Sequence, residues 1–520
     1  MKVAVGMLLA VLALSPALAQ PVVTSAAPLA TSVTVYRDPN RGEGRIDPRW
    51  PNGYALVSEK RRITLPAGES TIRFEGVADG MLAVSAVVTG LPGGVSEKNR
   101  DARLLSPASL LDGWLGNRVH LRRTNRQTGK VSESDAIIRS GPNNAVVLQT
   151  AEGVEALRCS GLPETIVYDG VPEGLSAKPT FTVNTASPGA TTVDVTLTYL
   201  ATGFDWGASY VARVAEDGKT LDLFAWLTLA NGNSAGFDGA QLLAVAGAPN
   251  RTSDFGTLVA QPPSPVLNLQ CWPMDSTSTH DAWGLPVPPP PAPPMPMMYE
   301  MAVAAAPQAM RMAKGNIAAD SIARQEELGD LKLYRVPMPV DISSNGQKQV
   351  ALLQKAKVPF TLFYRATLSP FQSDTASRPI GIALRMQNKD KDGLGIPLPS
   401  GGLVVMQERA DDELLLADAQ MRDRAVGEKV EIDAGSNDQL RIQQETLSTD
   451  DDGTLRRVRV TLTSALDRPA PVEILIDRTD GYDLVASGRT LTPKDGGRLW
   501  ALTLPANGKA VLDYSLRRQD

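Results

Sequence analysis

The sequence predicts a multi-domain, all-β protein, and residues 191–249 carry the clearest pattern for it. Four apolar residues alternate with threonine or aspartate from position 193 to 199, and five more alternate between 221 and 229. A period of two places one set of side chains on one face of a strand. Turn residues at short spacing elsewhere, and few helix signals, favour the same fold class. We expect a small N-terminal barrel or curled sheet, then β-sandwich modules.

The first nineteen residues are typical of a signal peptide. Lys2 provides the positive start, residues 3–14 form a short apolar run, and Ala17 and Ala19 match the small-x-small cleavage pattern. The run is well short of the ~20 residues that a membrane-spanning helix needs. We therefore expect cleavage before Gln20, no transmembrane segment afterwards, and an exported protein that is periplasmic or secreted.

An N-terminal β region is expected over residues 20–175. Residues 62–65 and 70–74 read as the two strands of a compact hairpin, and residues 82–88 alternate like a further strand. Closely spaced strand candidates then follow between residues 114 and 168. Short strands at this spacing predict a small barrel or a curled sheet.

The sequence also predicts two short helices and contains one cluster of basic residues. Ser106 and Pro107 form a helix start, because serine caps well and proline suits the first helical position. Residues 320–327 offer a second short helix. The basic cluster at residues 120–123, with Arg126, is interpreted as the solvated face of a strand, since surface charges of this kind are ordinary.

Residues 262–327 break the β pattern. A proline-rich stretch at residues 284–294 precedes a run rich in methionine and alanine. Consecutive prolines cannot donate sheet hydrogen bonds and favour polyproline II. The segment is therefore predicted to be a disordered, low-complexity insertion, either a tolerated surface loop or a flexible tether that binds a partner.

The insertion would divide one β-sandwich module into residues 179–261 and 328–520. Near the end of the chain, alternating apolar residues at 458–462, 472–476 and 512–516 are separated by turns. Strands in this arrangement suggest that residues 425–520 form an immunoglobulin-like sandwich.

Several short motifs in this split module resemble one family in the same order. They lie at residues 199–201, 204–210, 229–231, 236–240, 328–334, 347–353, 388–401 and 505–514. Together they are similar to the mucoidy-inhibitor-A-like family of bacterial envelope proteins, whose C-terminal domain has no assigned function. The resemblance covers about half of the chain and implies an envelope-associated, non-enzymatic β-protein. No a/d heptads match the coiled coil of longer members.

Catalytic motifs are weak. The chain has two histidines, His120 and His280, which disfavours histidine-based acid–base chemistry and multi-histidine metal sites. Residues 232–236 fit the G-x-S-x-G pattern around Ser234, but that motif needs a strand leading into a helix. A polar connection between two strands explains it better. We expect no catalytic residues and no cofactor.

Three stretches resemble ion sites without completing one. Residues 388–393 match the start of an EF-hand loop, but Pro399 occupies the position of the bidentate glutamate. Residues 450–453 are explained by turn chemistry. Six methionines between Met295 and Met312 have no regular spacing or histidine neighbours, so low complexity explains them better than a copper site. No metal site is predicted.

The two cysteines, Cys159 and Cys271, are candidates for one disulfide, because an exported compartment favours oxidation. The alternative is two unpaired thiols that pack as small apolar groups. The sequence leaves both open.

A formal net charge of −5, with interspersed charges, argues against nucleic acid as a partner. The function that fits best is a non-catalytic exported envelope protein that binds a polymer or a protein partner. The alternative is a carboxylate-dependent hydrolase of envelope polysaccharide, which needs no histidine.

Overall fold

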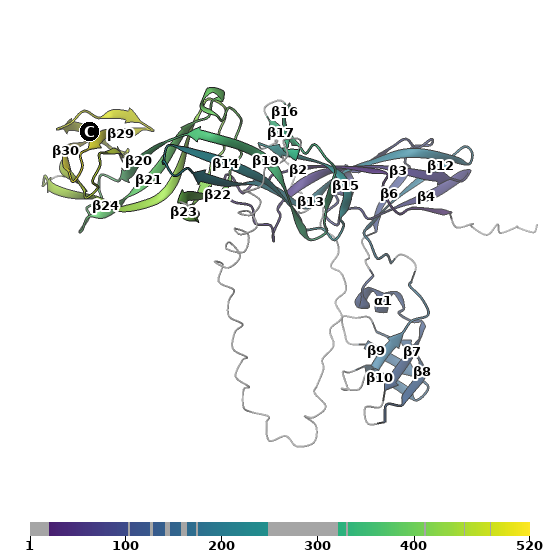
Figure 1. Cartoon of the computed structure of the whole chain (residues 1–520). Helices are drawn as coiled ribbons and strands as arrows, with labels where there is room; N and C mark the ends of the chain where they lie inside the picture. Colours follow the sequence, from purple (N-terminus) through teal and green to yellow (C-terminus); the bar gives the residue numbers. More distant parts are fainter. Residues whose placement is uncertain are drawn as a thin grey trace, which may run out of the picture.

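A computed structural model describes residues 20–101, 105–124, 128–140, 146–157, 164–172, 175–247, 321–328, 331–409, 412–451, 453–478 and 480–519. The described chain forms four β-sheets and contains one α-helix, so the predicted all-β class is confirmed at that level. The predicted signal peptide, most of the predicted insertion, and both cysteines lie outside the described residues. In Figure 1 the nine-stranded and five-stranded sheets form separate groups of strands, whereas the four-stranded sheet lies against one end of the twelve-stranded sheet.

The largest sheet has twelve strands and occupies the middle of the molecule. Its main path runs in the order β16 (Arg324–Leu328), β17 (Leu331–Arg335), β15 (Phe237–Ala246), β2 (Ala30–Tyr36), β3 (Gly53–Leu65), β13 (Thr191–Val214), β14 (Thr220–Asn231) and β19 (Gly346–Pro359). Four strands pair outside this path: β5 (Val87–Thr89), β18 (Val340–Ile342), β22 (Gly401–Arg409) and β23 (Asp412–Met421). The predicted N-terminal region and both halves of the predicted split module thus share one sheet.

The alternating stretches at 193–199 and 221–229 are confirmed as β13 and β14. β13 is 24 residues long and pairs with β3 along its first half and with β14 and β22 along its second. The register with β3 shifts next to Gly203, whose φ of 81° is a conformation that glycine adopts at little cost. One continuous strand therefore has different neighbours along its two halves.

A four-stranded sheet covers one face of β3 and β13. Its order is β1 (Val22–Ser25), β4 (Gly68–Glu75), β12 (Thr180–Ser187) and β6 (Glu97–Asp101). The predicted hairpin of residues 62–65 and 70–74 is wrong, because β3 pairs with β2 and β13 while β4 pairs with β1 and β12. Ile63 and Phe74 lie in one buried core, so the turn joins two packed sheets and buries the apolar face of each.

Two other predicted elements differ in the structure. Residues 82–88 contain a short 3-10 helix, Ala83–Ser85, followed by β5. Ser85 replaces strand pairing here, since its hydroxyl donates to the Leu82 carbonyl at 2.7 Å and accepts from the Leu200 N–H at 2.9 Å. The predicted helix at 320–327 is also wrong, because β16 pairs with β17 and tertiary pairing outweighs local propensity.

A smaller, five-stranded sheet contains the strands expected between residues 114 and 168. Its order is β10 (Gly153–Leu157), β9 (Val146–Thr150), β8 (Val131–Ile138), β7 (Arg118–Thr124) and β11 (Glu164–Val167). Helix α1 (Pro107–Gly113) packs Leu111 against it and starts at Ser106, which accepts from the Ser109 N–H. The predicted first helix is confirmed. On β7, Arg122 pairs with Glu133 at 2.7 Å on the exposed face, as predicted for the basic cluster.

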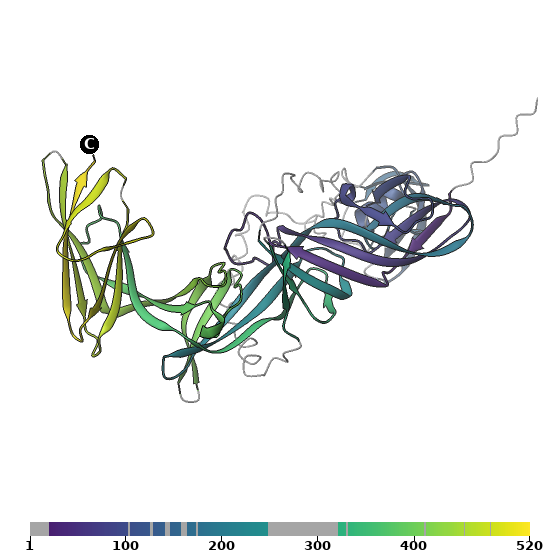
Figure 2. The same ribbon diagram turned by 90° about the horizontal axis from the view of Figure 1, so that it is seen from above.

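The C-terminal part forms a nine-stranded sheet with its own core. The order is β27 (Tyr482–Ser487), β30 (Lys509–Arg518), β25 (Leu455–Ser464), β24 (Lys429–Thr449), β21 (Arg378–Gln387), β20 (Thr361–Leu368), β26 (Ala470–Ile476), β29 (Gly497–Leu504) and β28 (Thr492–Lys494). The strands predicted at 458–462, 472–476 and 512–516 are β25, β26 and β30. Seen from above, this sheet lies at one end of the molecule and the four-stranded sheet lies toward the other end (Figure 2).

Candidate functional site

Two neighbouring cavities lie where β17 and β15 meet the loops around residues 395–399 and 423–428. Their volumes are about 730 and 220 Å³. We call them together the central groove. The larger cavity is lined by Ala246, Gly247, Gln325, Lys332, Tyr334, Gly395, Ile396, Pro397, Leu398, Pro399, Asp423, Arg424, Ala425, Val426 and Glu428. The smaller one shares Gln325, Tyr334, Ile396 and Pro397 and adds Ile322, Ala323, Leu352, Leu353, Gln354 and Lys355.

Two buried tyrosines hold the loop at residues 395–399 over the sheet. Tyr210 on β13 donates its hydroxyl to the Pro399 carbonyl at 2.6 Å, and Tyr334 on β17 reaches the Pro397 carbonyl at 3.5 Å. Burial raises the pKa of both hydroxyls, so each stays a neutral donor. The position of the loop at residues 395–399 is therefore set by two tyrosine side chains, one from β13 and one from β17.

Beneath the groove lies the buried guanidinium group of Arg37. Its Nη1 atom donates to Ser400 Oγ at 2.9 Å and lies 3.1 Å from Asp423 Oδ2, while its charged end stacks over Trp206 at 5.3 Å. In the described part of the chain, its Nε and Nη2 atoms have no hydrogen-bond partner. Buried donors of this kind retain hydrogen-bonding capacity that water or a ligand can satisfy.

The aspartate of the motif at 204–210 is structural. Asp205 is buried, lies 3.0 Å from Arg41 Nη1, and accepts from the backbone N–H groups of Asp38 and Trp206. Burial raises the pKa of Asp205 and lowers that of Arg41, and each partner opposes the shift of the other. This pair fixes the chain around residues 38–41 against β13.

Asn388 organises the two loops that wall the groove, and sequence reasoning missed this role. Its amide donates to the carbonyls of Ile396 at 2.7 Å and Ala425 at 2.9 Å and accepts from the Ile396 N–H at 3.2 Å. The side chain is fully buried. The EF-hand-like start of this segment thus serves as a loop clamp, and residues 390–392 form a 3-10 turn.

Other predicted residues lie away from the groove. Ser234 sits between β14 and β15, which confirms a connection between two strands, and its hydroxyl donates to Asp79 at 2.9 Å. His120 is 2.8 Å from Asp135 and 3.1 Å from Asp169 on the five-stranded sheet. Asp450 and Gly453 lie in the turn from β24 to β25, where the Gly453 N–H donates to the Asp450 carbonyl at 2.8 Å.

The remaining predictions fall outside the described residues, namely His280, the methionine run, Cys159 and Cys271. Among the residues that the structure describes, no group of three or more His, Cys, Asp or Glu side chains is arranged to hold a metal ion. None of the described helices is long and apolar enough to cross a membrane.

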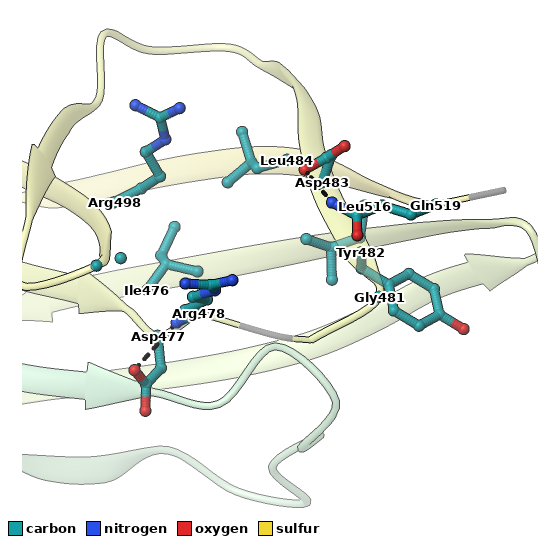
Figure 3. A pocket seen from close by; sticks show the side chains of 12 residues that line it. Ile476, Asp477, Arg478, Gly481, Tyr482, Asp483, Leu484, Arg498, Leu516 and Gln519 are labelled. Carbon is teal, nitrogen blue, oxygen red and sulfur yellow. Dashed lines mark hydrogen bonds between the residues drawn. The ribbon is translucent and has the colours of Figure 1, made fainter.

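A second, polar pocket of about 440 Å³ lies at the end of the nine-stranded sheet, between the ends of β26 and β30 and the starts of β27 and β29. Figure 3 shows Ile476, Leu484 and Leu516 in its middle, with charged side chains around them. Asp483 accepts from Gln519 at 2.9 Å, and no described carboxylate pairs with Arg498. Carboxylate acceptors and guanidinium donors therefore line one pocket.

No protein-family model matches the chain. No curated protein is significantly similar to it either. The resemblance to the mucoidy-inhibitor-A-like family thus stays a prediction from the motifs.

Three of those motifs nevertheless converge. Tyr334 of residues 328–334 and the loop within residues 388–401 line the groove. From residues 204–210, Tyr210 donates to the Pro399 carbonyl of that loop behind the lining. Trp206 and Tyr334 pack with ring centroids 5.8 Å apart. Segments far apart in sequence thus build one groove.

Proposed function

We propose that this protein is a non-catalytic, exported protein of the bacterial cell envelope and that its central groove binds a polymer or a protein partner. The observation that carries the proposal is the convergence of three resemblance motifs on one groove. The mixed apolar and polar lining of the groove suits ligand binding. Export rests on the signal-peptide pattern, and isolation of the mature chain starting at Gln20 would test it.

The proposed architecture has the same basis. We propose that the five-stranded sheet is a small curled barrel and that the nine-stranded sheet, with its own core, is a sandwich of immunoglobulin-like character. The Pro/Met/Ala-rich segment is proposed as a linker inserted between β15 and β16.

A substitution at the groove rim tests the binding site. Val426 lines the groove and is 52% exposed, so Val426→Asp should fold normally. We expect at least a tenfold loss of material captured from envelope extract and from a glycan array. The matched control is Val154→Asp on the five-stranded sheet, where the side chain is 70% exposed. Equal capture by both variants and the unsubstituted protein would remove the groove from the proposal.

The alternative is a carboxylate-dependent hydrolase of envelope polysaccharide, and one observation favours testing it. Two acids line each cavity, Asp423 and Glu428 in the groove and Asp477 and Asp483 in the polar pocket. Asp423 is held by Arg37, and Glu428 accepts from the Ala425 N–H at 2.9 Å. Release of shortened polysaccharide that is lost in Glu428→Gln or Asp483→Asn would establish the enzyme.

A further inference from the structure

The two end strands of the central sheet approach each other beside the groove. β16 pairs only with β17, and β19 pairs only with β14, among the described strands. Just before β16, the Ala323 N–H donates to the Ala351 carbonyl of β19 at 2.9 Å. The sheet therefore curls until its ends touch at one hydrogen bond.

Beyond that bond the two end strands separate. The smaller cavity of the groove lies between them, with Ile322, Ala323 and Gln325 on one side and residues 352–355 on the other. We call this gap the seam. Within the described residues, no strand pairs with the outer edge of β16 or β19 along it. Both edges thus present backbone donors and acceptors toward the gap.

We propose that the seam binds an extended polypeptide segment of a partner protein, which adds as a strand between β16 and β19. This inference rests on the proposed function and assigns the partner class of the central groove. Alternating N–H and C=O groups on both edges are matched by another peptide backbone, since a strand offers the same groups at the same spacing. A polysaccharide has no such repeat.

The side chains of the seam define the sequence that it would select. Leu353, Tyr334 and Ile396 form an apolar wall, so alternate residues of the partner strand should be apolar. Lys355 and Arg424 line the groove, and no described carboxylate lies within ion-pair distance of either. An acidic residue at the intervening positions of the partner would complement them.

Peptide selection on the whole protein tests the inference. Nonapeptides from a displayed random library would be selected, synthesised with a fluorescent label and titrated against the intact chain. We expect alternating apolar and acidic residues and at least tenfold weaker binding to the double variant Lys355→Glu, Arg424→Glu. The control Lys348→Glu, on β19 but outside the groove lining, should bind as the unsubstituted protein does.

N-methylation of the selected peptide distinguishes a strand from side-chain docking. Methylating alternate backbone nitrogens removes donors that strand addition requires, so affinity should fall at least tenfold. Unchanged affinity of the methylated peptide, insensitivity to the double variant, or a selection that yields no binding peptide would each overturn the inference. If Val426→Asp still reduces the capture of envelope material in those cases, the central groove remains the proposed binding site and only the strand-addition inference is lost.

Discussion

Single buried polar side chains decide the geometry of the groove. Asn388 joins two loops through three hydrogen bonds, Tyr210 holds the Pro399 carbonyl, and Arg37 anchors Ser400 and Asp423. The sequence identified the segment around Asn388 as turn chemistry, but a buried amide and an exposed turn amide look alike in sequence. Its role emerges only because residues 396 and 425 come together in the fold.

Asn388→Ala should weaken the fold and loosen the groove. The substitution leaves buried backbone groups of Ile396 and Ala425 unsatisfied, and each such group costs about 1–3 kcal/mol. We expect the free energy of unfolding in urea to fall by at least about 2 kcal/mol in total. Asn40→Ala, at an exposed position, is the matched control. Equal stability of both variants would show that the clamp contributes nothing.

At the scale of strands, charged side chains tie the nine-stranded sheet together. Arg385 on β21 lies 2.6 Å from Glu431 on β24 and 2.7 Å from Glu473 on β26, and Lys494 approaches Glu473 at 3.0 Å. Arg385 also stacks over Phe363 at 4.0 Å. Hydrogen bonds from Arg385 and Lys494 lower the pKa of Glu473 to about 2. The Glu473 carboxylate on β26 is thus linked to Arg385 on β21 and to Lys494 on β28.

This lowered pKa predicts acid sensitivity with a defined sign. The unfolded chain binds a proton at Glu473 near its ordinary pKa of 4.5, whereas the folded chain does so only near 2. The stabilisation is therefore present above pH 4.5 and is lost as the pH falls toward 2. Solvent screens the pair, so we expect Glu473→Gln to cost about 1 kcal/mol at neutral pH. Unfolding measured between pH 2 and 7 should show a flatter profile for the variant, and parallel profiles would contradict the assignment.

The sequence predicted some strands correctly but not their pairing partners, and the difference has a physical reason. The period of two in β13 and β14 identified both strands, because burial of one face leaves a local signature. That signature does not specify the partner of a strand. The stretches that became β3 and β4 read as a hairpin but enter different sheets, and residues 324–328 read as a helix but pair with β17. The groove was not predictable, since its lining comes from six separate segments.

At the scale of the whole molecule, strands on both sides of the predicted insertion hold together. β15 precedes it and pairs with β17, and β14 pairs with β19 along nearly its full length. The central core contains residues from both sides, among them Leu227 and Leu353. The chain on either side of the insertion therefore belongs to one folded unit.

Cutting the insertion should leave this unit intact. Limited proteolysis is expected to nick the chain near residues 288–312, since nicking concentrates at disordered loops and the low-complexity sequence predicts one there. The two fragments should co-elute in size-exclusion chromatography without denaturant and separate only after unfolding. Folded fragments that elute apart would contradict the shared core.

The cysteines predict a second long-range connection. A bond between Cys159 and Cys271 would close a long loop and could stabilise the protein by ~4–5 kcal/mol in the chain-entropy model. We expect thiol titration of the unreduced, denatured protein to find no free thiol. Two free thiols per chain would eliminate the bond.

Backbone protection on ligand binding tests the central claim most directly. Amide hydrogen exchange would be measured on the whole protein with and without the material captured from envelope extract. The central groove predicts slower exchange in β17 and in the loops at residues 395–399 and 423–428, with the five-stranded sheet unchanged as an internal control. Protection confined to the polar pocket at residues 476–498, or to the five-stranded sheet, would contradict the assignment of the groove as the binding site.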